Sequence, residues 1–178
     1  MIKKNNYSKY FENITNNVQS FDYRKIETIR KKISSLNKNN KIILIGNGGS
    51  ASISSHVAVD LTKILKKRAI CFNEPNLITC FANDYGYEKW AEKALEAYAL
   101  KNDIVILISS SGKSKNLINA GKFAKKKNLF VATFTGFKKN NPLSKIGNEN
   151  LWVNSTKYNV VEMTHHIWLL ALVDLISK

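Results

Sequence analysis

Residues 41–63 read "KIILIGNGGSASISSHVAVDLTK" and decide the fold. The apolar run 41–46 leads into a glycine-rich turn and then, without a proline, into the stretch 50–65, whose apolar residues recur at helical spacing. Backbone N–H groups at the start of a helix attract anions. The stretch therefore predicts a strand, a loop and a helix that together hold a dinucleotide, a nucleoside triphosphate or one small phosphorylated molecule.

The alternation of short apolar runs with helical stretches continues along the chain. Apolar runs without polar interruption, separated by helices, are typical of a parallel sheet that is covered on both faces. We therefore predict a doubly wound α/β fold with one or two additional helices in front of it. We expect strands at 41–46, 69–73, 103–109, 129–135 and 150–154. We expect one long helix or two at 7–37, helical segments at 76–99, and helices at 50–65, 114–127 and 158–177.

The 178 residues suffice for one domain with a full core, and we expect residues 1–178 to form that single domain. Within it, 1–38 is the helical segment and 39–178 the α/β core. Cys71 and Cys80 lack the spacing of metal ligands, which favours free thiols in a reducing cytoplasm. The first residues lack an apolar signal core, and no apolar run reaches the roughly 18 residues that span a bilayer, so we expect no membrane partner.

The chain is strongly basic, with 28 Lys and Arg against 13 Asp and Glu and a formal net charge of +15. The lysines are scattered over helix ends and turns, and arginines that could contact base edges are few. We therefore expect solvated basic faces and no nucleic-acid partner. The charge nevertheless favours the approach of anions, including phosphorylated metabolites.

The first loop matches the dinucleotide pattern G-x-G-x-x-A only in part. Gly46, Gly48 and Ala51 occupy its three positions. The acidic residue that should follow about 20 positions later, at the end of the next strand, is absent, because Glu74 comes late and after a polar break. A dinucleotide is therefore disfavoured.

A second loop, "SSSGKSKN" at 109–116, follows the apolar run "DIVILI". Its end resembles a P-loop, but Leu107 stands where the leading glycine belongs, so the loop is too short to wrap a triphosphate. Hydroxyls and free amides at a helix N-terminus suit a single phosphate. A helix cap, which contributes about 1 kcal/mol, would explain only one of the four serines. The predicted phosphate ligands are Ser109, Ser110, Ser111 and Ser114.

Three segments, "GNGGSASISSHVAVDLTK", "FANDYGYEKW" and "ISSSGKSKN", resemble in order and separation those of the sugar isomerase (SIS) family. Within it they are similar to the phosphoheptose isomerases, which convert sedoheptulose 7-phosphate to D-glycero-D-manno-heptose 7-phosphate for lipopolysaccharide or capsule. The resemblance covers nearly the whole chain. It implies a homotetramer with the N-terminal helix at subunit contacts and active sites between subunits. It also implies substrate contacts at Asn47, Gly48, Gly49, Ser50, Asn83 and Asp84, beside the four serines.

His56 and Asp60 are four residues apart on the helix after the first loop, so they share one face. Conversion of a ketose to an aldose needs a base that takes a proton from C1 and returns it at C2, and a carboxylate beside an imidazole suits this task. Without the resemblance, an ordinary surface pair stays open. The family has a glutamate at Asp60 and binds zinc there in many members. We expect Asp60 to be the principal base and to contact substrate.

The last helix, "VVEMTHHIWLLALVDLIS", departs from the family. The family has Gln-Glu-x-His with a second, catalytic histidine eight residues after the glutamine. Aligned on His165, Glu162 replaces the glutamine and contacts substrate, while Leu170 stands at the catalytic histidine. His166, on the face of Glu162, is the candidate second acid or base, although a core or capping role for one of the two histidines is equally open. The implied zinc ligands are His56, Asp60, Glu162 and His165, with His166 as the alternative to His165.

Three functions remain open. An isomerase of sedoheptulose 7-phosphate is favoured, because a scaffold needs none of the side chains of His56, Asp60, Glu162 and His165. The absent histidine at Leu170 favours a non-catalytic protein that binds phosphosugars or associates with a replication initiator. An isomerase of another phosphosugar, such as a hexose phosphate, is the third.

Overall fold

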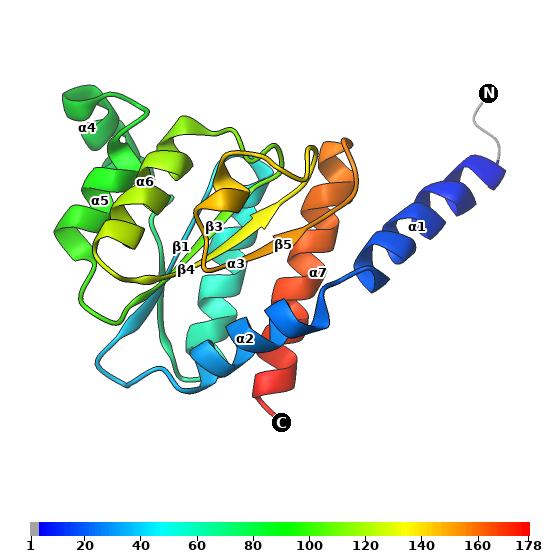
Figure 1. Ribbon diagram of the computed structural model, residues 1–178, viewed down its shortest axis with the longest axis horizontal. Helices are drawn as coiled ribbons and strands as arrows, with labels where there is room; N and C mark the ends of the chain where they lie inside the picture. The colour runs from blue at the N-terminus through cyan, green and yellow to red at the C-terminus, as the bar shows by residue number, and fades with distance from the viewer. Residues whose placement is uncertain (1–3) are drawn as a thin grey trace.

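The computed structural model describes residues 4–178 and contains one five-stranded parallel sheet between two layers of helices (Figure 1). The strand order is β2-β1-β3-β4-β5, so the winding direction switches between β1 and β3. The doubly wound α/β prediction is confirmed. The strands are β1 (Lys41–Gly46), β2 (Arg68–Cys71), β3 (Ile104–Ser109), β4 (Phe130–Thr135) and β5 (Glu149–Trp152).

Alternate residues of the central strands feed two separate cores, as the side-chain alternation of a strand requires. On one face, Ile42 and Leu44 pack with residues of three helices: α2 (Tyr23–Ser34), α3 (Gly49–Lys63) and α7 (Tyr158–Ile176). On the other face, Ile43 and Ile45 pack with α5 (Trp90–Tyr98) and α6 (Lys115–Lys126). Burial on both faces explains why these strands are continuous apolar runs.

The N-terminal segment consists of two helices, α1 (Lys4–Gln19) and α2. Asp22 separates them, because its side chain accepts hydrogen bonds from the backbone N–H groups of Arg24 and Lys25 and so begins a new helix. The indole of Trp168 on α7 holds the end of α1 by donating to the carbonyl of Val18 at 2.8 Å. The rest of α1 projects from the body (Figure 1). Residues 1–3 of the predicted segment lie outside the described part of the chain.

The predicted helical segments at 76–99 are two helices, α4 (Pro75–Tyr85) and α5. They are separated at Gly86, whose φ of +83° favours glycine. The strand before them, β2, ends earlier than predicted. After Phe72, whose N–H still donates to the carbonyl of Leu44 at 3.2 Å, the side chain of Asn73 takes over the pairing with β1. Its amide donates to the carbonyl of Gly46 at 2.7 Å and its oxygen accepts from the N–H of Gly46 at 3.1 Å.

The helix α7 is long and apolar enough, by length and composition, to cross a membrane. In the structure, Val161, Trp168, Leu169 and Leu172 on this helix are buried in the core against the sheet. A helix that is buried in a protein core can be as long and as apolar as a membrane span, so α7 is a core element of this domain.

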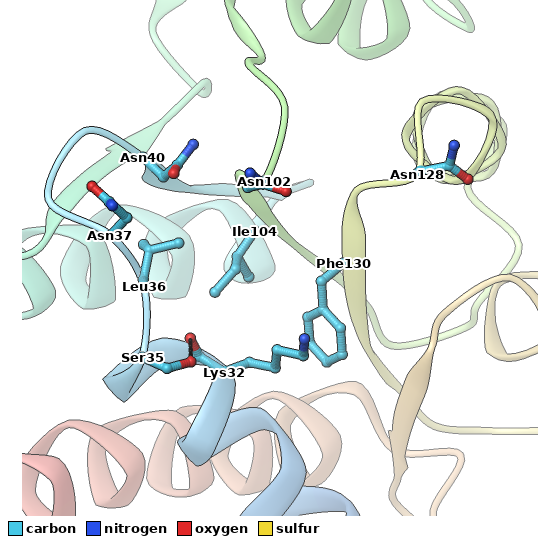
Figure 2. A pocket seen from close by; sticks show the side chains of 9 residues that line it. All are labelled: Lys32, Ser35, Leu36, Asn37, Asn40, Asn102, Ile104, Asn128 and Phe130. Atoms are coloured by element: carbon cyan, nitrogen blue, oxygen red, sulfur yellow. Dashed lines mark hydrogen bonds between the residues drawn. The ribbon is translucent and has the colours of Figure 1, made fainter.

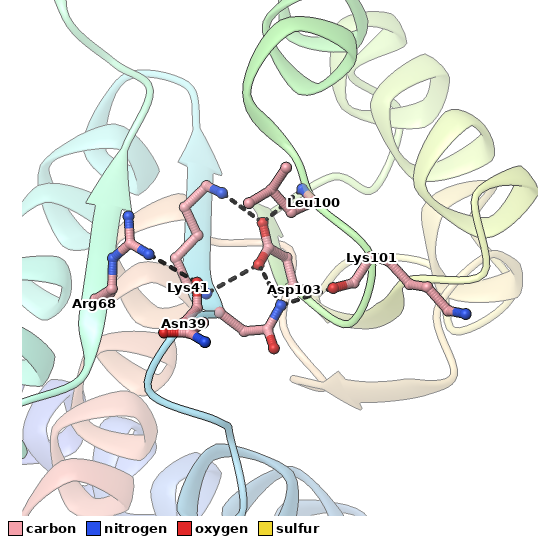
Figure 3. Close-up of polar contacts among 7 residues, drawn as sticks. Asn39, Lys41, Arg68, Leu100, Lys101 and Asp103 are labelled. Carbon is pink, nitrogen blue, oxygen red and sulfur yellow. Dashed lines mark hydrogen bonds and ion pairs between the residues drawn. The ribbon is translucent and has the colours of Figure 1, made fainter.

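The amino ends of the strands are joined by a buried carboxylate. Asp103 is fully buried and forms an ion pair with the Lys41 ammonium at 2.7 Å (Figure 3). It also accepts hydrogen bonds from the backbone N–H groups of Lys41 and Leu100, at 3.0 and 2.8 Å, and from the amide of Asn40 at 3.2 Å. The starts of β1 and β3 are thereby fixed to each other.

A cavity of about 350 Å³ opens at this same end, between α2 and the starts of β3 and β4 (Figure 2). Lys32 lies over the ring of Phe130 at one side of it. Asn102 and Asn128 line it with φ values of +72° and +56°, as asparagines in tight turns do. Its asparagines are therefore explained by the turns between helices and strands.

Candidate functional site

The first loop turns sharply from β1 into α3, and its glycines are required by close approach. A Cβ at Gly46 would overlap the backbone of Ser50, and one at Gly49 would overlap the carboxylate of Glu162. Gly48, the N-cap of α3, has a φ of +56° and provides no capping side chain. The start of α3 is therefore open toward the space above the sheet, with Glu162 from α7 against it.

The serine loop begins where β3 ends and leads into α6. Gly112 has a φ of +63°, and a Cβ there would overlap the side chain of the buried Asn141. Asn141 in turn holds the neighbouring loop, because its side-chain oxygen accepts a hydrogen bond from the N–H of Ser144 at 2.9 Å. Ser114 is the N-cap of α6 but makes no side-chain capping bond. Its hydroxyl instead lies 3.2 Å from that of Ser109. Helix capping therefore does not account for Ser114.

Both loops and Glu162 line one cavity of about 370 Å³ at the carboxyl ends of the strands. Ligands of open parallel sheets bind at this edge, at the switch point. The sequence predicts every lining residue except Ile108 and Tyr158. The lining consists of Asn47, Gly48, Gly49, Ser50, Ile108, Ser109, Ser110, Ser111, Ser114, Tyr158 and Glu162.

Two groups in this cavity are poorly satisfied by the protein. The hydroxyl of Ser110 is buried and has no hydrogen-bond partner among the described residues. Burial also raises the pKa of the Glu162 carboxyl, because the charged form loses solvation. Unsatisfied polar groups that converge on a cavity indicate a polar ligand.

A second polar cluster lies farther along α3, where it faces α7. Nε2 of His56 is 3.3 Å from a carboxylate oxygen of Asp60, and Nδ1 of His56 is 2.9 Å from Nε2 of His166. A carboxylate only accepts, so Nε2 of His56 carries the donated proton and Nδ1 accepts from His166. Burial lowers the pKa of His166, because the charged form loses solvation. The trio is thus a continuous path for a proton.

His165 is placed elsewhere, and its prediction as a metal ligand beside His56 is wrong. The side chain is fully buried between Phe134 and Trp168. Its Nε2 donates to the carbonyl of Thr135 at 3.1 Å, which ties α7 to β4. Burial lowers the pKa of His165 to about 4, so the ring is neutral at physiological pH. Of the two neighbouring histidines, His166 is the one that reaches α3.

Two further observations bear on the predicted metal site and its catalytic histidine. Leu170 stands where the family has its catalytic histidine, and its side chain packs against the apolar core. Position 170 therefore supplies no acid or base. Within residues 4–178, no group of three or more His, Cys, Asp or Glu side chains is arranged to hold a metal ion. The donors of the trio are instead hydrogen-bonded to one another.

The segment "FANDYGYEKW", residues 81–90, contributes differently from the prediction. Asn83 and Asp84 lie exposed near the end of α4, where the amide of Asn83 donates to Asp84 at 3.0 Å, and neither lines the cavity. The contact with the first loop is made by Tyr87, whose hydroxyl lies 3.2 Å from the side-chain oxygen of Asn47. Asn116, which also contacts Asn47, was missed as well. Only the fold brings these residues together, because they are 40 and 69 positions from Asn47.

The comparisons with known proteins agree with this geometry. A protein-family model described as "SIS domain" matches residues 6–136. The chain belongs to the SIS domain family. Among relatives of this SIS domain, a probable phosphoheptose isomerase of Thermoplasma acidophilum is 35% identical, over 88% of this chain and 90% of the relative. The phosphoheptose isomerase of Cytophaga hutchinsonii is 42% identical, over 58% of this chain and 56% of its own length.

A solved structure, of a phosphoheptose isomerase from Francisella tularensis, superposes on this SIS domain with a TM-score of 0.88. The identity is 25%, and the superposition covers 99% of this chain and 98% of that one. The whole architecture, including the additional N-terminal helices, is therefore shared with that isomerase.

Proposed function

We propose that this SIS domain is an aldose–ketose isomerase that converts sedoheptulose 7-phosphate to D-glycero-D-manno-heptose 7-phosphate. The observation that carries the proposal is the cavity in which the glycine loop and the serine loop meet at the start of α6. Free hydroxyls at a helix N-terminus suit one phosphate group. The similarity to phosphoheptose isomerases supports a seven-carbon phosphosugar and a role in supplying heptose for lipopolysaccharide or capsule.

In the proposed reaction, the four serines of the loop, Ser109, Ser110, Ser111 and Ser114, bind the phosphate. The sugar chain extends along α3 toward the trio of His56, Asp60 and His166. His56 lies seven residues after Gly49, about 10 Å along the helix. Asp60 takes the proton from C1 of the open-chain ketose and returns it at C2. His166 carries the compensating proton from the hydroxyl oxygen on C1 to the carbonyl oxygen on C2. Its hydrogen bond to His56 links it to Asp60.

We also propose that His166 takes the place of His165 in any zinc site. Two imidazoles and a carboxylate are donors that zinc accepts. To hold it, His56, Asp60 and His166 would have to give up the hydrogen bonds among them and turn toward a shared ion, with Glu162 nearby on α7. A bound zinc would supply polarisation of the substrate carbonyl. The proton transfers above need only the side chains of this chain.

The decisive experiment is incubation with sedoheptulose 7-phosphate, with zinc and with a chelator, followed by NMR of the anomeric protons. New heptose signals support the proposal, and their response to zinc tests the metal. His166→Ala should reduce turnover if His166 is the second acid or base. Binding without turnover in both conditions would favour a phosphosugar-binding protein, in line with Leu170. Turnover of a hexose phosphate alone would reassign the substrate.

We further propose a homotetramer in the cytoplasm. Tyr7 and Phe11 on the projecting helix α1 are 55% and 61% exposed, which is a liability on a monomer. A largely apolar groove lies between α7 and the chain from the end of α1 into α2, and it includes Phe21, Ile167 and Leu175. Residues 1–38 would then be the segment that joins subunits. A monomeric mass by light scattering at micromolar concentration would contradict this.

A further inference from the structure

The first loop is held from both sides by asparagine side chains. On the β2 side, Asn73 pairs with the backbone of Gly46. On the β3 side, Asn116 pairs with the side chain of Asn47, each amide donating to the oxygen of the other at 3.0 Å. Asn73 therefore fixes where the loop begins, whereas Asn116 fixes how the side chain of Asn47 is turned.

Asn116 is well placed for this. It is the second residue of α6, two positions after Ser114, and only 2% of it is exposed. A buried amide in a reciprocal pair has little freedom to rotate, because any rotation leaves polar atoms without partners. The pair therefore joins the glycine loop to the helix that begins at the serine loop.

The pairing also decides what Asn47 offers to a ligand. Its side-chain oxygen receives the amide of Asn116 and lies beside the hydroxyl of Tyr87. One of its two amide hydrogens is taken by Asn116, and the second is left for the cavity that Asn47 lines. Asn47 thus presents one oriented donor at a fixed distance from the serines.

We propose that Asn116 is a positioning residue for a carbohydrate phosphate. It holds the amide of Asn47 against a hydroxyl or carbonyl oxygen of the sugar while the serine loop holds the phosphate. The identity of the ligand rests on the function proposed above. Asn116 itself makes no contact with the reacting atoms, since it acts through Asn47 and does not line the cavity.

The test is a double-mutant cycle with Asn116→Leu, Asn47→Ala and the double variant. Leucine keeps the branched shape of asparagine, with the same number of non-hydrogen atoms, and removes both hydrogen bonds. Asn76→Ala is the matched control, because Asn76 is also the second residue of a helix and its amide donates only locally, to Glu74. Calorimetry with inorganic phosphate and with sedoheptulose 7-phosphate, together with kcat, gives three readouts for each variant.

We expect Asn116→Leu to bind inorganic phosphate within about twofold of the wild type but the phosphosugar about tenfold more weakly. The value of kcat should fall about 10- to 100-fold, because misplaced contacts cost mainly the reactive geometry. The double variant should be no worse than Asn47→Ala, since both changes remove one interaction. Additive losses, an unchanged phosphosugar affinity, or an equal loss of inorganic phosphate would each overturn the proposal.

The two proposals fail in different ways. If the wild type binds the phosphosugar without turnover, the isomerase proposal fails and the binding arm still decides the role of Asn116. If the wild type binds phosphosugar no more tightly than phosphate, there is no sugar contact to position and the inference on Asn116 is wrong. Should Asn116→Leu not fold, Asn116→Ser removes the same pair, and its melting curve separates a loss of folding from a loss of positioning.

Discussion

The two ends of the sheet differ in whether their polar groups have hydrogen-bond partners. At the amino end, Asp103 is enclosed by the ammonium of Lys41 and by three hydrogen-bond donors. At the carboxyl end, the hydroxyl of Ser110 is buried without a partner in the described chain, and Glu162 is a half-buried carboxylate whose pKa is raised by loss of solvation. One end is arranged for stability, and the other keeps unsatisfied groups that a ligand can satisfy.

Cavity size does not reveal this difference. The cavities at the two ends are similar, at about 350 and 370 Å³. At the amino end, Asn102 and Asn128 line the cavity because tight turns place asparagines there. At the carboxyl end, the cavity is lined by serines, a helix N-terminus and a carboxylate. The chemistry of the lining therefore distinguishes the two, and the following predictions test the contrast.

The largest expected effect is the loss of turnover when Asp60 is replaced. Asp60→Asn keeps the shape of the side chain and removes its basicity, so turnover should fall by about 10²–10⁴-fold while phosphosugar affinity survives. Thermal stability should change little, because Asp60 lies in the site region and is partly exposed. Isomerase assays and calorimetry on the same preparation check both points. A near-normal rate would show that another group transfers the proton.

Asp103→Ala should show the converse. It leaves the Lys41 ammonium and two backbone N–H groups without their partner, which should destabilise the fold by about 3 kcal/mol. A melting temperature lower by about 10 °C is expected for a chain of this size. The kcat of the remaining folded protein should stay unchanged below the transition. Loss of activity at full stability would mean that the two ends are not separate.

Asp103 should also make the stability of the fold depend on pH. Burial alone would raise its pKa, but hydrogen bonds from Lys41, Leu100 and Asn40 outweigh it and hold the pKa below its usual value. Because the folded-state pKa is the lower one, the contribution to stability is present above the unfolded pKa, about 3.9, and is lost as the pH falls through the folded value. Asp103→Asn should therefore flatten the acid side of the stability curve, as followed by urea unfolding at several pH values.

Loss of one phosphate donor should have a smaller effect. A hydrogen bond to a charged group contributes roughly 1.5–3 kcal/mol, so Ser111→Ala and Ser114→Ala should each weaken phosphosugar binding about tenfold or more. Stability should be nearly unaffected by Ser114→Ala, because that hydroxyl makes no capping bond. Calorimetry with unchanged affinity in both variants would place the phosphate elsewhere.

The smallest effect concerns Glu162. Its folded pKa is raised by burial, so the protein loses stability as the pH rises from the unfolded pKa through the folded one. Glu162→Gln should therefore raise the melting temperature slightly at neutral pH, and the gain should disappear below about pH 4. A lower melting temperature at neutral pH would show that the carboxylate is stabilised by a partner.

The sequence by itself determined the elements and their class. Continuous apolar runs separated by helical patterns identified the parallel sheet, and all five strands were expected within a few residues of their observed ends. The sequence did not locate helix ends that a single residue decides: the side chain of Asp22 caps α2, and Gly86 adopts a positive φ because it lacks a Cβ. Both loops at the carboxyl end could be predicted, because glycines and serines at the start of a helix have a local physical reason.

Only the tertiary structure decided which distant side chains meet. His165 and His166 are adjacent in sequence, yet one is buried against β4 and the other faces His56, since successive residues of a helix point about 100° apart. Asn116 gives no signal in the sequence, because its role depends on a partner 69 positions away. Local patterns fix local conformation, whereas the packing of α7 and α6 on the sheet fixes which groups share the site.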